Sequence, residues 1–167
     1  MKSYLPLVQS LDQLVTVYRH LLDVVRKENE VLIKADMKEI PEINEAKEKM
    51  VLKVRQLDKQ WMVSAKELAV ELKMETQEPK LLELAAHLTG EEAKKLEQLH
   101  SVLNMLVQRI VEYNKKNEIL VYAALSHITG AMDSITATLN ENPTYKHSGG
   151  MEPKNKDASG RLIQKEV

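Results

Sequence analysis

Apolar residues recur at spacings of three and four along four stretches of this chain, and this pattern predicts α-helices. We expect a first helix over residues 5–34, a second over 40–73, a short helix over 80–88 and a long helix over 89–139. The first helix has a seam that alternates by four and three, as in a coiled coil: Leu7, Leu11, Leu14, Tyr18, Leu21, Val25 and Leu32. Glu28 lies on that seam in place of an apolar residue, so we expect looser packing there.

Helix-start signals and prolines separate these helices. Residues 36–39 form a capping signal and Pro41 follows, so the first connection is very short and its two helices should be antiparallel neighbours. Residues 89–92, Thr-Gly-Glu-Glu, have the spacing of a capping box at the start of the long helix. Pro143 ends that helix, because the residue before a proline is pushed out of the helical conformation.

The second helix has a stripe that Lys47 interrupts, and Trp61 is most simply an anchor in its core face. Its apolar positions are Ile43, Met50, Val54, Leu57, Trp61, Leu68 and Leu72. In the long helix the heptad continues through Leu96, Leu99, Leu103, Leu106, Ile110 and Tyr113. We expect these seams to form the core of a helical bundle.

The long helix changes character after Asn117. The apolar spacing shifts there to successive fours before it returns to threes and fours, a stutter that rotates the stripe around the helix. Residues 119–140 then contain a single formal charge, Asp133, in a chain of which 29% is charged. Gly130 costs about 1 kcal/mol relative to Ala, and it either allows a close approach by another backbone or is simply tolerated. One face carries Val121, Leu125, Ile128, Met132, Ile135 and Leu139.

The length of the last helix makes this apolar face a candidate binding surface. About 50 residues at 1.5 Å each give a rod of roughly 75 Å, about 25 Å longer than the other long helices. In an up-down-up bundle we expect the excess, which contains residues 124–139, to project past the first turn and to offer its apolar face to a partner. The alternative is that the short helix or a kink shifts the register and the bundle covers this face.

Composition agrees with an all-α fold. The chain has 167 residues with five Gly, five Pro and no Phe, and 43% of them are hydrophobic, which is enough for an aliphatic core. We predict an antiparallel bundle of three long helices plus one short helix in residues 1–140, with a very long C-terminal helix. Residues 141–167 are rich in Gly, Pro, Ser and Lys and lack apolar periodicity, so we predict a flexible tail.

Charge and cysteine content limit the classes of function. A net charge of −1 gives no reason to expect nucleic acid or an anionic membrane as the main partner. The absence of Cys excludes thiolate chemistry and suits a reducing cytoplasm. The N-terminus lacks the apolar core of a signal peptide. Residues 119–139 are long enough to span a bilayer, but their hydroxyl groups, His127 and Asp133 favour a helix in water.

No motif in the chain indicates an enzyme. It has no glycine-rich phosphate loop, no Gly-x-Ser-x-Gly and no Cys nucleophile. Glu97 and His100 form one Glu-x-x-His, but a di-iron bundle needs a second copy and two further glutamates, so a solvated helix face is the better interpretation. Glu83 and His87 are likewise expected to be a surface pair. We therefore predict no metal and no cofactor.

A set of helix-face residues forms a familiar pattern: Glu28, Leu32, Asp36, Lys47 and the run Asn114-Lys115-Lys116-Asn117-Glu118-Ile119-Leu120. Together with a late Tyr, this set resembles the FlgN family along nearly the whole chain. The most telling element is Asn-x-x-Asn-x-x-Leu in the long helix. In the family pattern a late Tyr is followed directly by Gly, whereas this chain has Tyr145-Lys146-His147-Ser148-Gly149-Gly150.

The resemblance implies a cytoplasmic, non-enzymatic, helical chaperone of flagellar export. Such a protein would bind the C-terminal helical segments of the two hook–filament junction proteins, block their premature polymerisation and deliver them to the type III export gate. The resemblance also implies that Tyr145 docks on the cytoplasmic domain of that gate. The sequence itself predicts that client helices bind the apolar face of residues 121–139.

Other interpretations stay open at this point. A structural homo-oligomeric coiled coil would bury the same apolar face against a second copy of the chain. A di-metal bundle enzyme would need ligands that the sequence lacks. Tyr145 could instead fold back and cap the end of the long helix.

Overall fold

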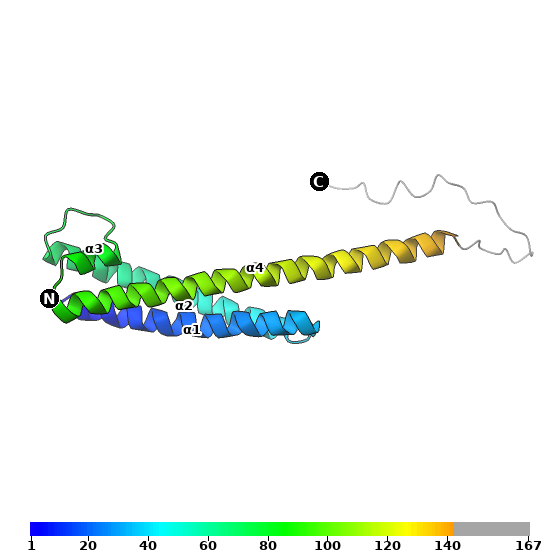
Figure 1. The fold of residues 1–167 in the computed structure, drawn as a ribbon, viewed down its shortest axis with the longest axis horizontal. Coiled ribbons are helices and arrows are strands. Elements are labelled where there is room, and N and C mark those ends of the chain that lie inside the picture. Colours follow the sequence, from blue (N-terminus) through cyan, green and yellow to red (C-terminus); the bar gives the residue numbers. More distant parts are fainter. Residues whose placement is uncertain (142–167) are drawn as a thin grey trace, which may run out of the picture. The chain divides into compact units, whose positions relative to one another are not determined.

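The computed structural model describes residues 1–141, of which 86% are helical, with no strand among them. The helices are α1 (Tyr4–Lys34), α2 (Ile40–Glu71), α3 (Leu81–Ala86) and α4 (Gly90–Glu141), in that order along the chain (Figure 1). The prediction of an all-α fold with a very long last helix is confirmed. The predicted tail, apart from Glu141, lies outside the described residues.

The chain divides into two units, Met1–Val121 and Tyr122–Val167. The first contains α1, α2, α3 and the N-terminal part of α4, and the described part of the second is the remainder of α4. The predicted boundary between a bundle of residues 1–140 and a tail stays a prediction.

The ends of α1 and α2 use the same local device. Ala35 and Lys73 adopt the left-handed conformation, with φ of 54° and 58°. The residue after each of them donates its N–H five residues back, from Asp36 to Val31 O (3.1 Å) and from Met74 to Ala69 O (2.9 Å). These Schellman-type ends satisfy carbonyl groups that the helix leaves free. They also explain why α2 ends at Glu71, before the predicted Lys73.

Within the first unit the three long helices run up, down and up. Ser3 Oγ donates to Glu71 Oε1 (2.8 Å), which joins the start of α1 to the end of α2, so these helices are antiparallel. The Tyr4 hydroxyl donates to the Glu92 carbonyl (3.1 Å), 88 positions further along the chain. Asn29 Nδ2 donates to Asn117 Oδ1 (2.7 Å), again 88 positions further along, so α4 lies parallel to α1 in a constant register.

The predicted seams form most of the core of this unit. In α1 the structure buries Val31 in place of the expected Leu32, which is half-buried. Trp61 was expected to be a core anchor, but it only packs against the edge of the core and is half-buried. Its indole Nε1–H donates to Asp58 Oδ1 (3.1 Å), which keeps that end of the ring at the surface. Seam residues buried as predicted include Leu7, Leu11, Leu14, Leu21, Val25, Leu57, Leu68, Leu96, Leu99, Leu103, Leu106 and Ile110.

Candidate partner-binding surface

Six large apolar side chains lie exposed on the C-terminal part of α4, and we call them the exposed stripe. Their exposed fractions range from 41% at Val121 to 70% at Leu139. The remaining members are Leu125, Ile128, Met132 and Ile135. Large apolar residues scattered singly on a surface need no explanation, but a contiguous row of them usually marks an interaction site.

Four hydroxyl groups of the same segment are satisfied within the helix. The hydroxyls of Thr129, Ser134, Thr136 and Thr138 each donate to the carbonyl four residues earlier, at 2.9–3.0 Å. Such bonds occupy the hydroxyl hydrogen without a partner from outside the helix. Covering these hydroxyl groups with an apolar partner therefore costs less free energy than their number suggests. Asp133 is the single formal charge of residues 119–140.

Gly130 lies within this helical segment, and a Cβ added there would meet nothing within 4 Å. The helix itself therefore gives no reason for a glycine at this position.

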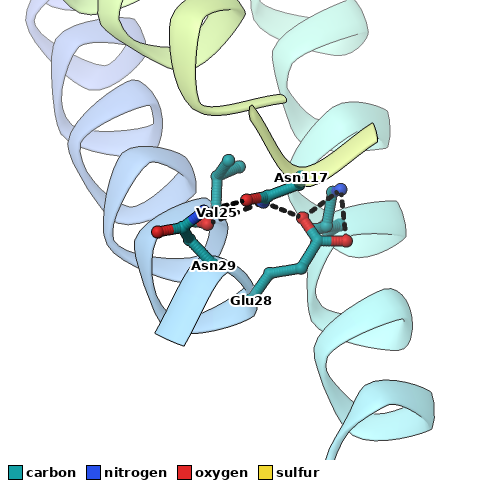
Figure 2. Close-up of polar contacts among 5 residues, drawn as sticks. Val25, Glu28, Asn29 and Asn117 are labelled. Carbon is teal, nitrogen blue, oxygen red and sulfur yellow. Dashed lines mark hydrogen bonds and ion pairs between the residues drawn. The ribbon is translucent and has the colours of Figure 1, made fainter. Parts of the chain in front are cut away.

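A buried polar cluster lies on the other part of α4 and joins all three long helices (Figure 2). We call it the Asn117 network, and its side chains are Glu28, Asn29, Lys47 and Asn117. Asn117 Nδ2 donates to Glu28 Oε2 (2.8 Å) and to the Val25 carbonyl (3.0 Å). Lys47 Nζ donates to both carboxylate oxygens of Glu28, at 3.0 and 2.8 Å. Two different acceptors thus use both hydrogens of the Asn117 amide.

This network corrects the expectation that packing loosens at Glu28. Glu28 and Asn117 are only 8% and 4% exposed, so both are buried as deeply as their apolar neighbours. The Glu28 carboxylate tolerates burial because Lys47 compensates its charge and Asn117 supplies a further hydrogen bond. Sequence reasoning noted each of these residues separately, as an interruption of a stripe or as a family resemblance, but it did not bring them together.

A shallow cleft of about 550 Å³ lies beside Trp61, where α2 approaches α3. Its apolar lining includes Met62, Pro79 and Leu82, and its polar lining includes Glu83 and His100. The position of Trp61 at this cleft, rather than inside the core, accounts for its partial exposure.

The metal candidates do not form a site in the part of the chain that the structure describes. Within residues 1–141 no three side chains of the His, Asp and Glu types come together as a metal ion requires. His87 Nδ1 lies 3.0 Å from the carbonyl of Glu83 and therefore contacts the backbone rather than the Glu83 carboxylate. Among the described helices none is long and apolar enough to cross a membrane.

The family model described as FlgN protein matches residues 1–153. The chain belongs to the FlgN family. Searches of curated proteins and of solved structures gave no match.

FlgN membership places the chain among the chaperones of flagellar export and confirms the resemblance drawn from the helix-face residues. FlgN is a family of chaperones and not of enzymes. The Asn117 network contains several of the residues that carried the resemblance. Tyr145, the predicted export-gate docking residue, lies outside the described residues, although within the matched range.

Proposed function

We propose that this FlgN-family chain works in the cytoplasm and binds the C-terminal helices of the two hook–filament junction proteins on the exposed stripe. By covering those helices it prevents their premature polymerisation, and it then delivers the clients to the export gate. The observation that supports the proposal is the exposure of six large apolar side chains on one helix face in a segment with a single charge.

The chemistry of the stripe favours a helical partner with an apolar face of its own. Its members recur at the spacing of one side of an α-helix, so an amphipathic helix laid alongside would contact them in turn. Covering a half-exposed Leu, Ile or Met removes about half of its surface from water, which contributes about 1 kcal/mol per side chain. Loss of rotational and translational freedom offsets a large part of that sum, so we expect moderate affinity.

The stripe lacks the charges that give a homomeric coiled coil its register. Charged pairs flanking an apolar seam normally fix the alignment of identical helices, and Asp133 is the single charge available here. A second copy of the chain is therefore a poorer partner than a client helix that brings its own complementary surface.

For the export gate we propose that Tyr145 is the anchor. A single aromatic residue in an otherwise polar segment can fill a pocket of a partner, and aromatic residues often dominate the energy of such contacts. Ordering of the surrounding residues would keep the affinity modest, which suits a delivery step that must be reversible.

Titration of the purified chain with synthetic peptides tests the client proposal. The peptides should span the C-terminal helices of the two hook–filament junction proteins, with scrambled peptides of equal composition as controls. We expect a one-to-one complex by calorimetry and a free chain that is monomeric by light scattering. A free chain that forms dimers or larger assemblies at micromolar concentration and ignores the peptides would favour the homo-oligomeric alternative.

A further inference from the structure

The apolar seam of α4 does not by itself define how far along α1 and α2 this helix lies. If α4 moved by one heptad toward its own N-terminus, each core position would receive the residue seven places later. The places of Leu96, Leu99, Leu103 and Leu106 would then be taken by Leu103, Leu106, Ile110 and Tyr113, respectively. All of the incoming residues are apolar or aromatic, so hydrophobic packing alone discriminates weakly between the two registers.

Asn117 is the residue that breaks this equivalence. After a shift by one heptad its amide would occupy the place of Ile110, which is 6% exposed and packed among apolar side chains. Ala124 would occupy the place of Asn117 and could not donate to Glu28 or to the Val25 carbonyl. The shifted register therefore buries an amide without partners and removes a hydrogen bond from a buried carboxylate.

We propose that Asn117 is a register-setting residue, which holds α4 in its observed position through Glu28 and Lys47. A single polar residue at a core position is the best-attested means by which helices that pack together specify one alignment. The register also defines where the three-helix core ends. Asn117 is the last buried residue of α4 within the first unit.

Two other features restrain α4 and make the proposal open to disproof. Only residues 87–89 link α3 to α4, and a shift would require the first turns of α4 to unwind. The hydrogen bond from the Tyr4 hydroxyl to the Glu92 carbonyl would also be lost. If these restraints alone set the register, replacement of Asn117 leaves α4 where it is.

Distance measurements between two spin labels report the register directly. The chain contains no Cys, so labels attach only at introduced cysteines. Leu5 in α1 and Val111 in α4 are 61% and 59% exposed, which makes Leu5→Cys and Val111→Cys suitable sites away from the Asn117 network. At 1.5 Å per residue the labels are separated by roughly 27 Å along the helix axes, and a shift of one heptad shortens this by about 10 Å.

Three variants in this labelled background test the proposal. Asn117→Leu removes the amide, and we expect a second population of labels whose separation is about 10 Å shorter. The double variant Asn117→Leu with Ala124→Asn moves the amide one heptad along α4, so the shorter distance should become the main one. Asn114→Leu is the matched control, because Asn114 is an exposed asparagine of the same helix. It should give the wild-type distance alone.

Each outcome decides the proposal. Wild-type distances in both Asn117 variants would show that the α3–α4 link sets the register, and Asn117 would have no positioning role. Loss of helical circular dichroism in the double variant would also overturn the proposal, because relocation of the amide should produce a folded, shifted bundle. A second population in Asn114→Leu would show that α4 occupies more than one register even when the Asn117 network is intact, and Asn117 would not be the residue that sets it.

Discussion

Asn117 Nδ2 lies 2.8 Å from Glu28 Oε2, although the two residues are 89 positions apart in the chain. Lys47 Nζ, from α2, lies 2.8 Å from the same carboxylate oxygen. One buried carboxylate thus contacts a residue from each of the other two long helices. The core of the first unit therefore combines hydrophobic packing with polar contacts that favour one alignment of the three long helices.

Replacement of Lys47 should show how far Glu28 depends on it. Lys47→Met leaves a carboxylate whose side chain is 11% exposed without a countercharge, and we expect a loss of about 2–4 kcal/mol in the free energy of unfolding measured with urea. The double variant with Glu28→Leu removes both charges and should recover part of that loss, because the buried Asn117 amide then lacks its Glu28 acceptor. Lys49→Met is the control, because its pair with Glu45 is exposed and should contribute nothing measurable.

A charge on the exposed stripe should weaken partner binding and spare the fold. Ile128 is 61% exposed, so Ile128→Asp should leave the circular dichroism and the thermal midpoint of the free chain nearly unchanged. Against a packed client helix the same carboxylate is desolvated, and we expect at least a tenfold loss of peptide affinity by calorimetry. Ile33→Asp is the matched control, at 66% exposure on α1. Equal losses in both variants would exclude the stripe as the client site.

Trp61 should contribute less to stability than its position in a predicted core stripe suggests. The core assignment predicts a loss of about 3–5 kcal/mol for Trp61→Ala. Because the ring is half-buried at the edge of a cleft, we expect about 1–2 kcal/mol instead. Urea unfolding measures the difference. A loss above about 3 kcal/mol would mean that the ring is buried in solution.

Gly130→Ala should stabilise the C-terminal part of α4. The added Cβ meets nothing within 4 Å, and Ala is favoured over Gly inside a helix by about 1 kcal/mol. Hydrogen exchange of the amides around residue 130 should slow about fivefold, while the global unfolding midpoint changes little. If client affinity falls in this variant, the partner backbone approaches Gly130 closely and the glycine is functional.

Tyr145→Ala separates client binding from delivery. If Tyr145 anchors the chain on the export gate, the variant should bind client peptides with unchanged affinity and keep its thermal midpoint, whereas secretion of the clients fails. Secretion assays in a strain that carries only the variant provide the measurement. Normal secretion would remove the docking role, and loss of peptide binding would indicate that Tyr145 belongs to the structure around the end of α4.

Local patterns of the sequence were sufficient for the helices themselves. The spacing of Leu7, Leu11 and Leu14 reflects the 3.6-residue period of a single helix, which depends only on near neighbours in the chain. The ends of the long helices were predicted to within about two residues for the same reason, because prolines and capping residues act locally. The residues of the FlgN resemblance, such as Glu28, Lys47 and Asn117, could also be recognised from the sequence without knowledge of their contacts.

The tertiary structure decided what covers each apolar face. Leu103 and Leu125 both lie on apolar faces of α4, yet Leu103 is 9% exposed and Leu125 is 53% exposed. Periodicity states which side of a helix is apolar and not whether another helix lies against it. Glu28 and Lys47 were separate interruptions of two stripes, and Asn117 was one residue of the family resemblance, until the register of α1, α2 and α4 placed the three within hydrogen-bond distance. That register depends on contacts between residues far apart in the chain, which no local pattern contains.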